Sequence, residues 1–167
     1  ILIEVDPDNP NYASSNGILF NKDLTVLIQC PAGIDGDFVI PDNVRYIGDR
    51  AFEGCDGITA VVIPDGVESI GDYAFYYLSI ITSVTIPGSV ESIGEGAFRS
   101  CQELASILLS EGLLRIGDEA FADLPITSIE IPASVISLGN GVFDHCDQLV
   151  EIGVDPNNDF FTSINGM

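Results

Sequence analysis

The chain has 167 residues, 46% of them hydrophobic, so it can form a substantial core and is not a disordered polypeptide. It carries 26 acidic and five basic residues, and the net charge of -21 argues against nucleic acid or anionic lipid surfaces as partners. No apolar run approaches the ~18–20 residues that a membrane-spanning helix needs, so no membrane insertion is predicted.

The first 39 residues follow no regular period. Residues 3–5 alternate and predict a short strand, which the proline-rich residues after it end. Two β-rich runs at 18–20 and 25–28 flank a short polar connection and predict a β-hairpin. Residues 31–36 contain Pro31 and two glycines and predict a loop that leads into the next segment.

From Ile40 onward the sequence repeats. An apolar residue, usually followed by proline, recurs at positions 40, 63, 86, 109, 131 and 154, a period of 23 with one step of 22. A period of this size predicts a stacked solenoid. Each repeat ends in an alternating apolar stretch such as Val84, Thr85, Ile86, which predicts a strand, and a second apolar pair such as Val67 and Ile70 predicts a shorter one. Stacked coils would pair these strands in parallel.

Three further positions recur in every repeat. The Ala-Phe stretch is too short for a lone helix and predicts one helical or 3₁₀ turn. Its phenylalanines should form a buried aromatic column: Phe52, Phe75, Phe98, Phe121 and Phe143. A second column should contain Ile47, Ile70, Ile93, Ile116 and Leu138. The recurring glycine predicts a turn with positive φ at Gly48, Gly71, Gly94, Gly117 and Gly139.

The opening of the chain recurs at its end. Residues 152–156 match residues 3–7 at an offset of 149, and Phe161 then matches Tyr12, as Asn165-Gly166 matches Asn16-Gly17. We therefore divide one solenoid domain into a hairpin-bearing repeat (1–39), five regular repeats (40–154) and the start of a further hairpin-bearing repeat (155–167). We expect the chain to be part of a longer array.

The cysteines are expected to have a structural role and not a catalytic or metal-binding one. Cys55, Cys101 and Cys146 share one repeat position two coils apart, ~10 Å at the ordinary strand spacing, which exceeds the ~7 Å that a disulfide spans. We expect them to be free, buried thiols, whereas Cys30 lies outside this register and its pairing stays open. His145 is expected to point outward, away from Cys146. No catalytic, metal or phosphate-binding motif is present, so neither catalytic residues nor a cofactor are predicted.

A line of acidic residues is expected along one edge of the solenoid. The residue after each recurring glycine is Asp49, Asp72, Glu95, Asp118 and then Asn140. We interpret this line as a solvated edge. The alternative is that calcium bridges the carboxylates.

Two surfaces are candidate binding sites. The strand face opposite the core should be flat and rich in small and hydroxyl-bearing residues, and Thr85, Leu108 and Glu130 should lie on it. It lacks the Trp, Tyr and Arg side chains that usually anchor protein interfaces. Tyr73, Tyr76 and Tyr77 form the better candidate anchor.

The repeat pattern Cys-x-x-Leu-x-x-Ile-x-Leu/Ile-Pro-x-x-Val-x-x-Ile-Gly-x-x-Ala-Phe resembles the BspA-like (Treponema pallidum type) leucine-rich repeats. Cys101, Leu104, Ile107 and Leu109 carry the first part of the match, and residues 86–98 carry the rest. Departures from the pattern are Ser110 for Pro, and Leu78 and Leu124 for Cys.

The resemblance implies a right-handed, mainly β leucine-rich-repeat solenoid of the α/β class. It also implies a secreted or cell-surface protein that binds host or other extracellular proteins without catalysis. The alternative is a structural spacer that presents another, possibly catalytic, domain of a longer parent chain.

Overall fold

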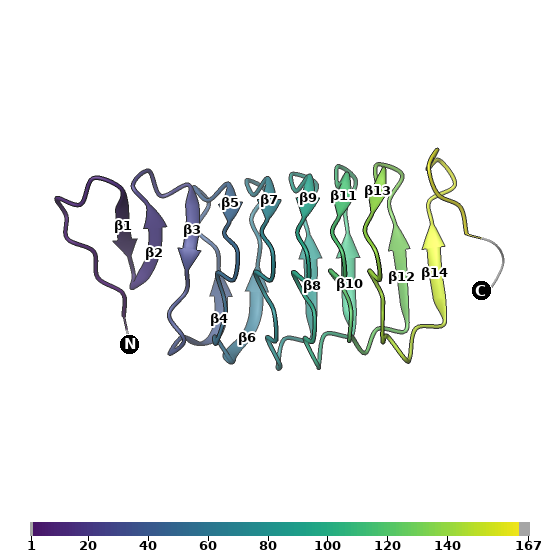
Figure 1. Ribbon diagram of the computed structural model, residues 1–167, viewed down its shortest axis with the longest axis horizontal. Coiled ribbons are helices and arrows are strands. Elements are labelled where there is room, and N and C mark those ends of the chain that lie inside the picture. The colour runs from purple at the N-terminus through teal and green to yellow at the C-terminus, as the bar shows by residue number, and fades with distance from the viewer. Residues whose placement is uncertain (1, 164–167) are drawn as a thin grey trace.

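The computed structural model describes residues 2–163 and shows an elongated β-solenoid with its termini at opposite ends (Figure 1). Each regular coil contains one long and one short strand, as the sequence predicts. The long strands are β4 (Asp35–Val39), β6 (Gly57–Val62), β8 (Ser83–Ile86), β10 (Ser106–Leu109), β12 (Ser128–Ile131) and β14 (Glu151–Val154). The short strands are β5 (Tyr46–Ile47), β7 (Ser69–Ile70), β9 (Ser92–Ile93), β11 (Arg115–Ile116) and β13 (Ser137–Leu138).

The short strands form one continuous sheet with the N-terminal strands β1 (Tyr12–Ser15), β2 (Ile18–Asn21) and β3 (Val26–Gln29). The order in this sheet is β1-β2-β3-β5-β7-β9-β11-β13. The predicted hairpin is confirmed, because β2 and β3 pair antiparallel. From β3 to β13 all neighbours are parallel, so β3 joins the hairpin to the solenoid.

The sequence analysis misplaced the first strand. Residues 3–5 are not a strand, and the Val5 N–H instead donates to Ser14 Oγ at 2.9 Å. The extra strand is β1, which pairs antiparallel with β2. The predicted loop at 31–36 also ends earlier than expected, because Gly36 lies within β4 and pairs in parallel with β6.

The long strands pair in parallel two by two. The described residues form the pairs β4-β6, β8-β10 and β12-β14 as separate two-stranded sheets. The backbone ladder is thus interrupted between β6 and β8 and between β10 and β12, although these strands lie side by side. The predicted parallel pairing is found among both the long and the short strands, and it is continuous among the short ones.

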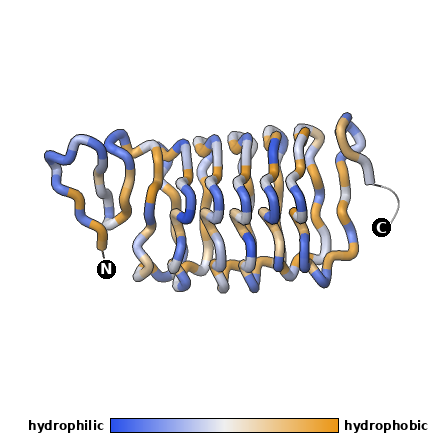
Figure 2. Tube along the Cα trace, viewed as in Figure 1, coloured by the Kyte–Doolittle hydropathy of each residue, from blue (hydrophilic) through white to orange (hydrophobic). Residues whose placement is uncertain are grey.

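The core lies between the two strand layers and consists of columns of equivalent residues. Val84 and Ile86 of β8 point inward and Thr85 points outward, as predicted. Along the aromatic column, successive rings are stacked with centroids 4.7, 4.9, 5.7 and 6.1 Å apart. Figure 2 shows hydrophobic segments recurring from coil to coil. Leu138 and Phe143, in the last regular coil, are only partly buried.

The recurring glycines serve a different purpose from the one predicted. Gly71 and Gly94 do not have positive φ. A Cβ at Gly94 would lie 2.7 Å from Asp72 N and 2.7 Å from Gly71 C, so glycine is required because neighbouring coils approach closely.

Positive φ occurs elsewhere in the repeat. It recurs two residues after the glycine at Arg50, Tyr73, Gly96, Glu119 and Gly141, and again at Gly54, Tyr77, Ser100, Asp123 and His145. Most of these residues carry side chains, which accept the left-handed conformation at an energetic cost.

The Ala-Phe stretch forms hydrogen-bonded turns and not a helix. In one coil the Ala51 N–H donates to Gly48 O at 3.2 Å, and the Cys55 N–H donates to Phe52 O at 3.1 Å. No helix within residues 2–163 is long and apolar enough to cross a membrane.

The two ends of the chain share a local structure at the offset of 149 residues. The Asp6 Oδ1 accepts a hydrogen bond from Asp8 N at 2.8 Å, and Asp155 Oδ1 accepts one from Asn157 N at the same distance. The Asn158 Oδ1 likewise accepts the Phe161 N–H at 2.8 Å, and at the other end Asn9 Oδ1 accepts the Tyr12 N–H at 3.0 Å. The predicted match at Asn165-Gly166 lies outside the described residues.

Candidate functional site

The acidic edge is built from hydrogen bonds between coils. Asp49 Oδ1 accepts the N–H of Asp72 at 2.9 Å, and Asp72 Oδ1 accepts the N–H of Glu95 at 2.8 Å. Asp118 Oδ1 does the same for Asn140 at 2.7 Å. Each aspartate therefore binds the backbone of the next coil. Residues 2–163 contain no cluster of three or more His, Cys, Asp or Glu side chains arranged to hold a metal ion.

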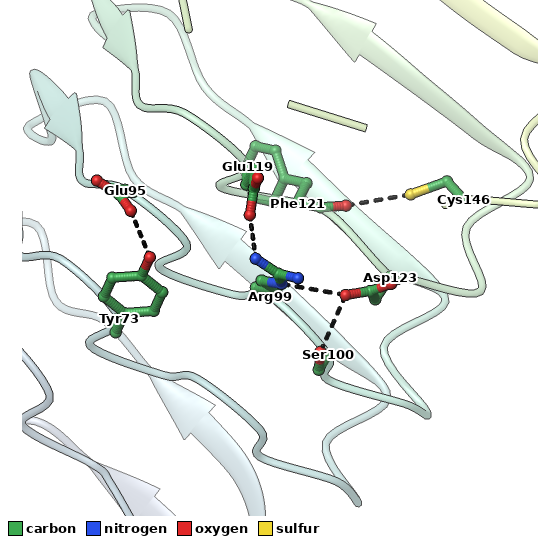
Figure 3. A network of polar contacts seen from close by, with 8 residues as sticks. All are labelled: Tyr73, Glu95, Arg99, Ser100, Glu119, Phe121, Asp123 and Cys146. Carbon is green, nitrogen blue, oxygen red and sulfur yellow. Dashed lines mark hydrogen bonds and ion pairs between the residues drawn. The ribbon is translucent and has the colours of Figure 1, made fainter. Parts of the chain in front are cut away.

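Next to this edge, Arg99 ties two coils together (Figure 3). Its Nη1 donates to Glu119, and its Nε donates to Asp123 Oδ2 at 3.1 Å. Ser100 Oγ donates to the same Asp123 oxygen at 3.2 Å. The hydrogen bond to Asp123 raises the pKa of Arg99, with partial desolvation opposing it. Since the three charged side chains are 33–40% exposed, the network stabilises the fold only modestly.

The structure brings the three predicted tyrosines together. The rings of Tyr73 and Tyr76 meet edge to face with centroids 5.8 Å apart, and those of Tyr76 and Tyr77 are 5.9 Å apart. The guanidinium of Arg50 lies 5.2 Å from the Tyr73 ring centroid. We call Tyr73, Tyr76 and Tyr77 the tyrosine cluster.

Two hydroxyls of the tyrosine cluster already have partners within the chain. The Tyr73 hydroxyl donates to Glu95, which raises the pKa of Tyr73 (Figure 3). The Tyr77 hydroxyl accepts a hydrogen bond from Gln102 Nε2 at 3.3 Å. Only Tyr77, 48% exposed, is largely open to solvent. The cluster thus packs coils together as well as forming part of the surface.

The second candidate surface is the long-strand face, defined as the outward side chains of β4, β6, β8, β10, β12 and β14. Thr85, Leu108 and Glu130 are all exposed on it, on three successive strands. Val39 and Val62 occupy the same register on β4 and β6. With exposures of 62% for Val39, 52% for Val62 and 60% for Leu108, these three side chains leave apolar surface uncovered.

Sequence reasoning missed Val39 because it predicted a loop at 31–36, began the regular repeats at Ile40 and assigned no strand between them. The signal was present: Val39-Ile40-Pro41 has the same residues as Val62-Ile63-Pro64. The apolar part of the long-strand face is therefore larger than predicted.

Two shallow depressions lie on the long-strand face where the ladder is interrupted. One, of about 270 Å³, lies between β6 and β8 and is lined by Ala60, Val62, Ser83 and Thr85 among others. The other, of about 330 Å³, lies between β10 and β12 and includes Ser106, Ser128 and Glu130. Backbone groups that a ladder would pair are left for water or a ligand at both places.

All four cysteines are buried and none is joined in a disulfide in this structure, and Cys55, Cys101 and Cys146 are not bonded to one another, as expected. Burial raises the pKa of Cys101 to about 12. His145 is exposed and Cys146 is buried, so the structure separates their side chains as expected.

The expectation that Cys30 lies outside the repeat register is wrong. In the regular coils the N–H of the stacking phenylalanine donates to an Ala carbonyl of the next coil, for example Phe52 to Ala74 at 2.9 Å. The Cys30 N–H donates to Ala51 O at 2.7 Å in the same way. Cys30 therefore occupies the aromatic-column position of the hairpin-bearing coil.

Comparisons with known proteins agree with this architecture. Among solved structures, the pneumococcal vaccine antigen PcpA is 25% identical over 95% of this chain and 42% of its own chain, with a TM-score of 0.73. A leucine-rich repeat protein from Bacteroides ovatus is 30% identical over 89% of this chain and 41% of its own, with a TM-score of 0.69. The chain thus spans less than half the length of either relative.

A T. pallidum leucine-rich repeat protein, 22% identical over 91% of this chain and 83% of its own, shares the fold with a TM-score of 0.70. No curated protein sequence matches the chain. The family model for the BspA type leucine-rich repeat region matches residues 36–150 in six copies. Since this match extends over more than half of the sequence, the protein belongs to the BspA type leucine-rich repeat family.

Proposed function

We propose that this chain is a non-catalytic protein-interaction module of a secreted or cell-surface protein, and that it binds extracellular proteins through its long-strand face. The observation that carries the proposal is the uncovered apolar surface of Val39 and Val62 on adjacent strands and of Leu108 two strands further on, with Thr85 between them. Exposed apolar surface of this kind marks interaction sites. The likeness to a pneumococcal vaccine antigen supports a surface or extracellular location.

The charges around this face define the partner that fits it. The outward residues of the long strands include Asp37, Glu130 and Glu151 and no basic residue, within a chain of net charge -21. The complementary surface is apolar at its centre and rimmed by Lys and Arg. The apolar contact supplies affinity, whereas the charges speed the encounter and make it sensitive to salt.

Capture from an extracellular protein extract tests this proposal. The immobilised chain is compared with a Val62→Asp/Leu108→Asp variant, which keeps the core intact because both side chains point outward. We expect the native chain to retain a basic protein and salt to elute it. The variant should fail to bind the same protein. Equal capture by native chain and variant would contradict the assignment of the face, and failure of the native chain to retain any protein would contradict the binding role.

The second candidate function is a spacer that holds another domain of a longer protein at a distance. The relatives PcpA and the Bacteroides ovatus protein favour it, because this chain covers only 42% and 41% of their lengths. The continuous short-strand sheet would suit such a role by making the segment stiff. A parent protein whose binding to extracellular proteins is unchanged after deletion of residues 1–167 would support the spacer function over the binding function.

A further inference from the structure

Where a regular coil has cysteine at its repeat position, the thiol contacts the backbone of the aromatic-column residue in the coil before it. The Cys101 thiol donates to the carbonyl of Phe75 at 3.1 Å. Cys55 makes the equivalent contact, with its Sγ 3.4 Å from the carbonyl oxygen of Cys30. Because Cys30 replaces phenylalanine at this position, the boundary between the hairpin-bearing coil and the first regular coil places two cysteines together.

The Cys55 thiol thus lies against Cys30. The nearby Cys55 thiol raises the pKa of Cys30, and burial acts in the same direction. The nearby Cys30 thiol lowers the pKa of Cys55, with burial opposing it. Neither residue has any solvent-exposed surface, and both belong to the main core.

The local packing accommodates a small residue at position 30. The ring of Phe38 packs edge to face against Phe52, with centroids 5.3 Å apart and planes at 82°. Phe38 thus covers the end of the aromatic column that a phenylalanine at position 30 would otherwise cover. The cysteine pair is therefore built into a filled core.

We propose that Cys30 and Cys55 are a disulfide-forming pair that covalently ties the hairpin-bearing coil to the first regular coil. The oxidant is a low-molecular-weight disulfide such as oxidised glutathione. One cysteine thiolate attacks its S–S bond and releases one glutathione thiolate. The second cysteine thiolate then attacks the resulting mixed disulfide, which forms the Cys30–Cys55 bond and releases the second glutathione thiolate.

One S–S bond breaks and one forms, and the two cysteine protons end on the two glutathione thiolates. Because the folded core shields both thiols, exchange takes place during folding, before the coils close over them. The inference does not depend on the proposed binding function.

Oxidative refolding followed by thiol mapping tests the pair. The denatured, reduced chain is refolded in a glutathione redox buffer, its free thiols are alkylated, and its peptides are identified by mass spectrometry without reduction. We expect one cross-linked peptide pair containing Cys30 and Cys55, lighter by two hydrogens than the two reduced peptides. Cys101 and Cys146 should be alkylated. The oxidised chain should also melt at a higher temperature than the reduced chain, because the cross-link restricts the unfolded state.

Two variants make the outcome decisive. A Cys101→Ala/Cys146→Ala chain should give the same cross-linked peptide, and a Cys55→Ala chain should give none. A refolded native chain with the circular dichroism of a β-protein and four alkylated cysteines would overturn the proposal. A cross-link that joins Cys30 to Cys101 or Cys146, or a mixture of pairings, would overturn it as well.

Discussion

At the scale of the residue, the solenoid depends on positions where one side chain meets its own equivalents in the neighbouring coils. Phe98 is fully buried and lies between Phe75 and Phe121, at centroid distances of 4.9 and 5.7 Å. Removal of this ring therefore leaves a cavity, and the rings above and below it are left without a stacking partner on that side. The cost of such a cavity adds to the lost transfer free energy.

Phe98→Ala should accordingly lower the free energy of unfolding by roughly 3–5 kcal/mol. Urea denaturation followed by circular dichroism measures the change. Phe160→Ala is the matched control, since Phe160 is 62% exposed, and its effect should stay within about 0.5 kcal/mol. Similar losses in the two variants would show that the aromatic column does not carry the stability assigned to it.

Glycine and non-glycine positions should respond in opposite ways. Gly94→Ala forces a Cβ to within 2.7 Å of the backbone of the preceding coil, and should destabilise the fold by roughly 1–3 kcal/mol. His145 has φ 58° and is exposed, so His145→Gly should stabilise it by about 1 kcal/mol. The melting temperatures of both variants, measured by thermal denaturation, test these two expectations. If alanine at position 94 were tolerated, the close approach of the coils would be wrong.

At the scale of the element, side chains at the edges join each coil to the next. The Asp72 carboxylate accepts the Glu95 N–H at 2.8 Å, and this bond repeats along the acidic edge. The carboxylates therefore have a structural partner without any metal ion. The calcium alternative is still open to a direct test.

Asp72→Asn should leave stability nearly unchanged, because the amide oxygen accepts the same N–H, whereas Asp72→Ala should cost about 1 kcal/mol. Melting temperatures of both variants and of the native chain are compared with and without millimolar calcium. We expect calcium to have no effect on the native chain. A rise in its melting temperature that Asp72→Asn abolishes would favour the metal interpretation.

Two exposed tyrosine–glutamate hydrogen bonds join neighbouring coils. Tyr46 donates to Glu68 Oε2 at 2.8 Å and Tyr73 donates to Glu95, and each bond raises the tyrosine pKa above its ordinary 10.0. A group with a raised folded-state pKa contributes stability below its unfolded pKa, and that contribution is lost as the pH rises through the folded pKa.

Stability should therefore fall above about pH 10, and the fall should be smaller in a Tyr46→Phe/Tyr73→Phe chain. Urea denaturation at a series of pH values measures it, and ultraviolet absorbance should show two fewer late-titrating phenols in the variant. Identical alkaline profiles for the two chains would exclude a contribution from these bonds.

At the scale of the whole molecule, the repeat is readable from the sequence because equivalent positions carry the same residue types. The period gives both strands of each coil, the aromatic column and the outward position of Thr85. The recurring glycine was misread because a sequence pattern does not distinguish positive φ from close packing of backbones. The residues that do take positive φ, such as Arg50 and Tyr73, give no sequence signal for it.

The hairpin-bearing coil was the harder part to predict. Its strand β4 begins with Asp35, Gly36 and Asp37, which hide the apolar alternation, and Cys30 replaces the phenylalanine that marks the register. The interruptions between the long strands have no counterpart in the repeat pattern. Of the candidate binding residues, the sequence supplied Thr85, Leu108 and Glu130 but not Val39.

The central claim is that the long-strand face, and not the tyrosine cluster, contacts the partner. Photo-cross-linking tests it most directly, with a benzophenone amino acid placed at Thr85 in one chain and at Tyr77 in another. Both positions are exposed, so the probe should leave the core undisturbed. After irradiation with an extracellular protein extract, the account predicts a covalent adduct from position 85 and none from position 77. An adduct from position 77 alone, or from neither, would contradict it.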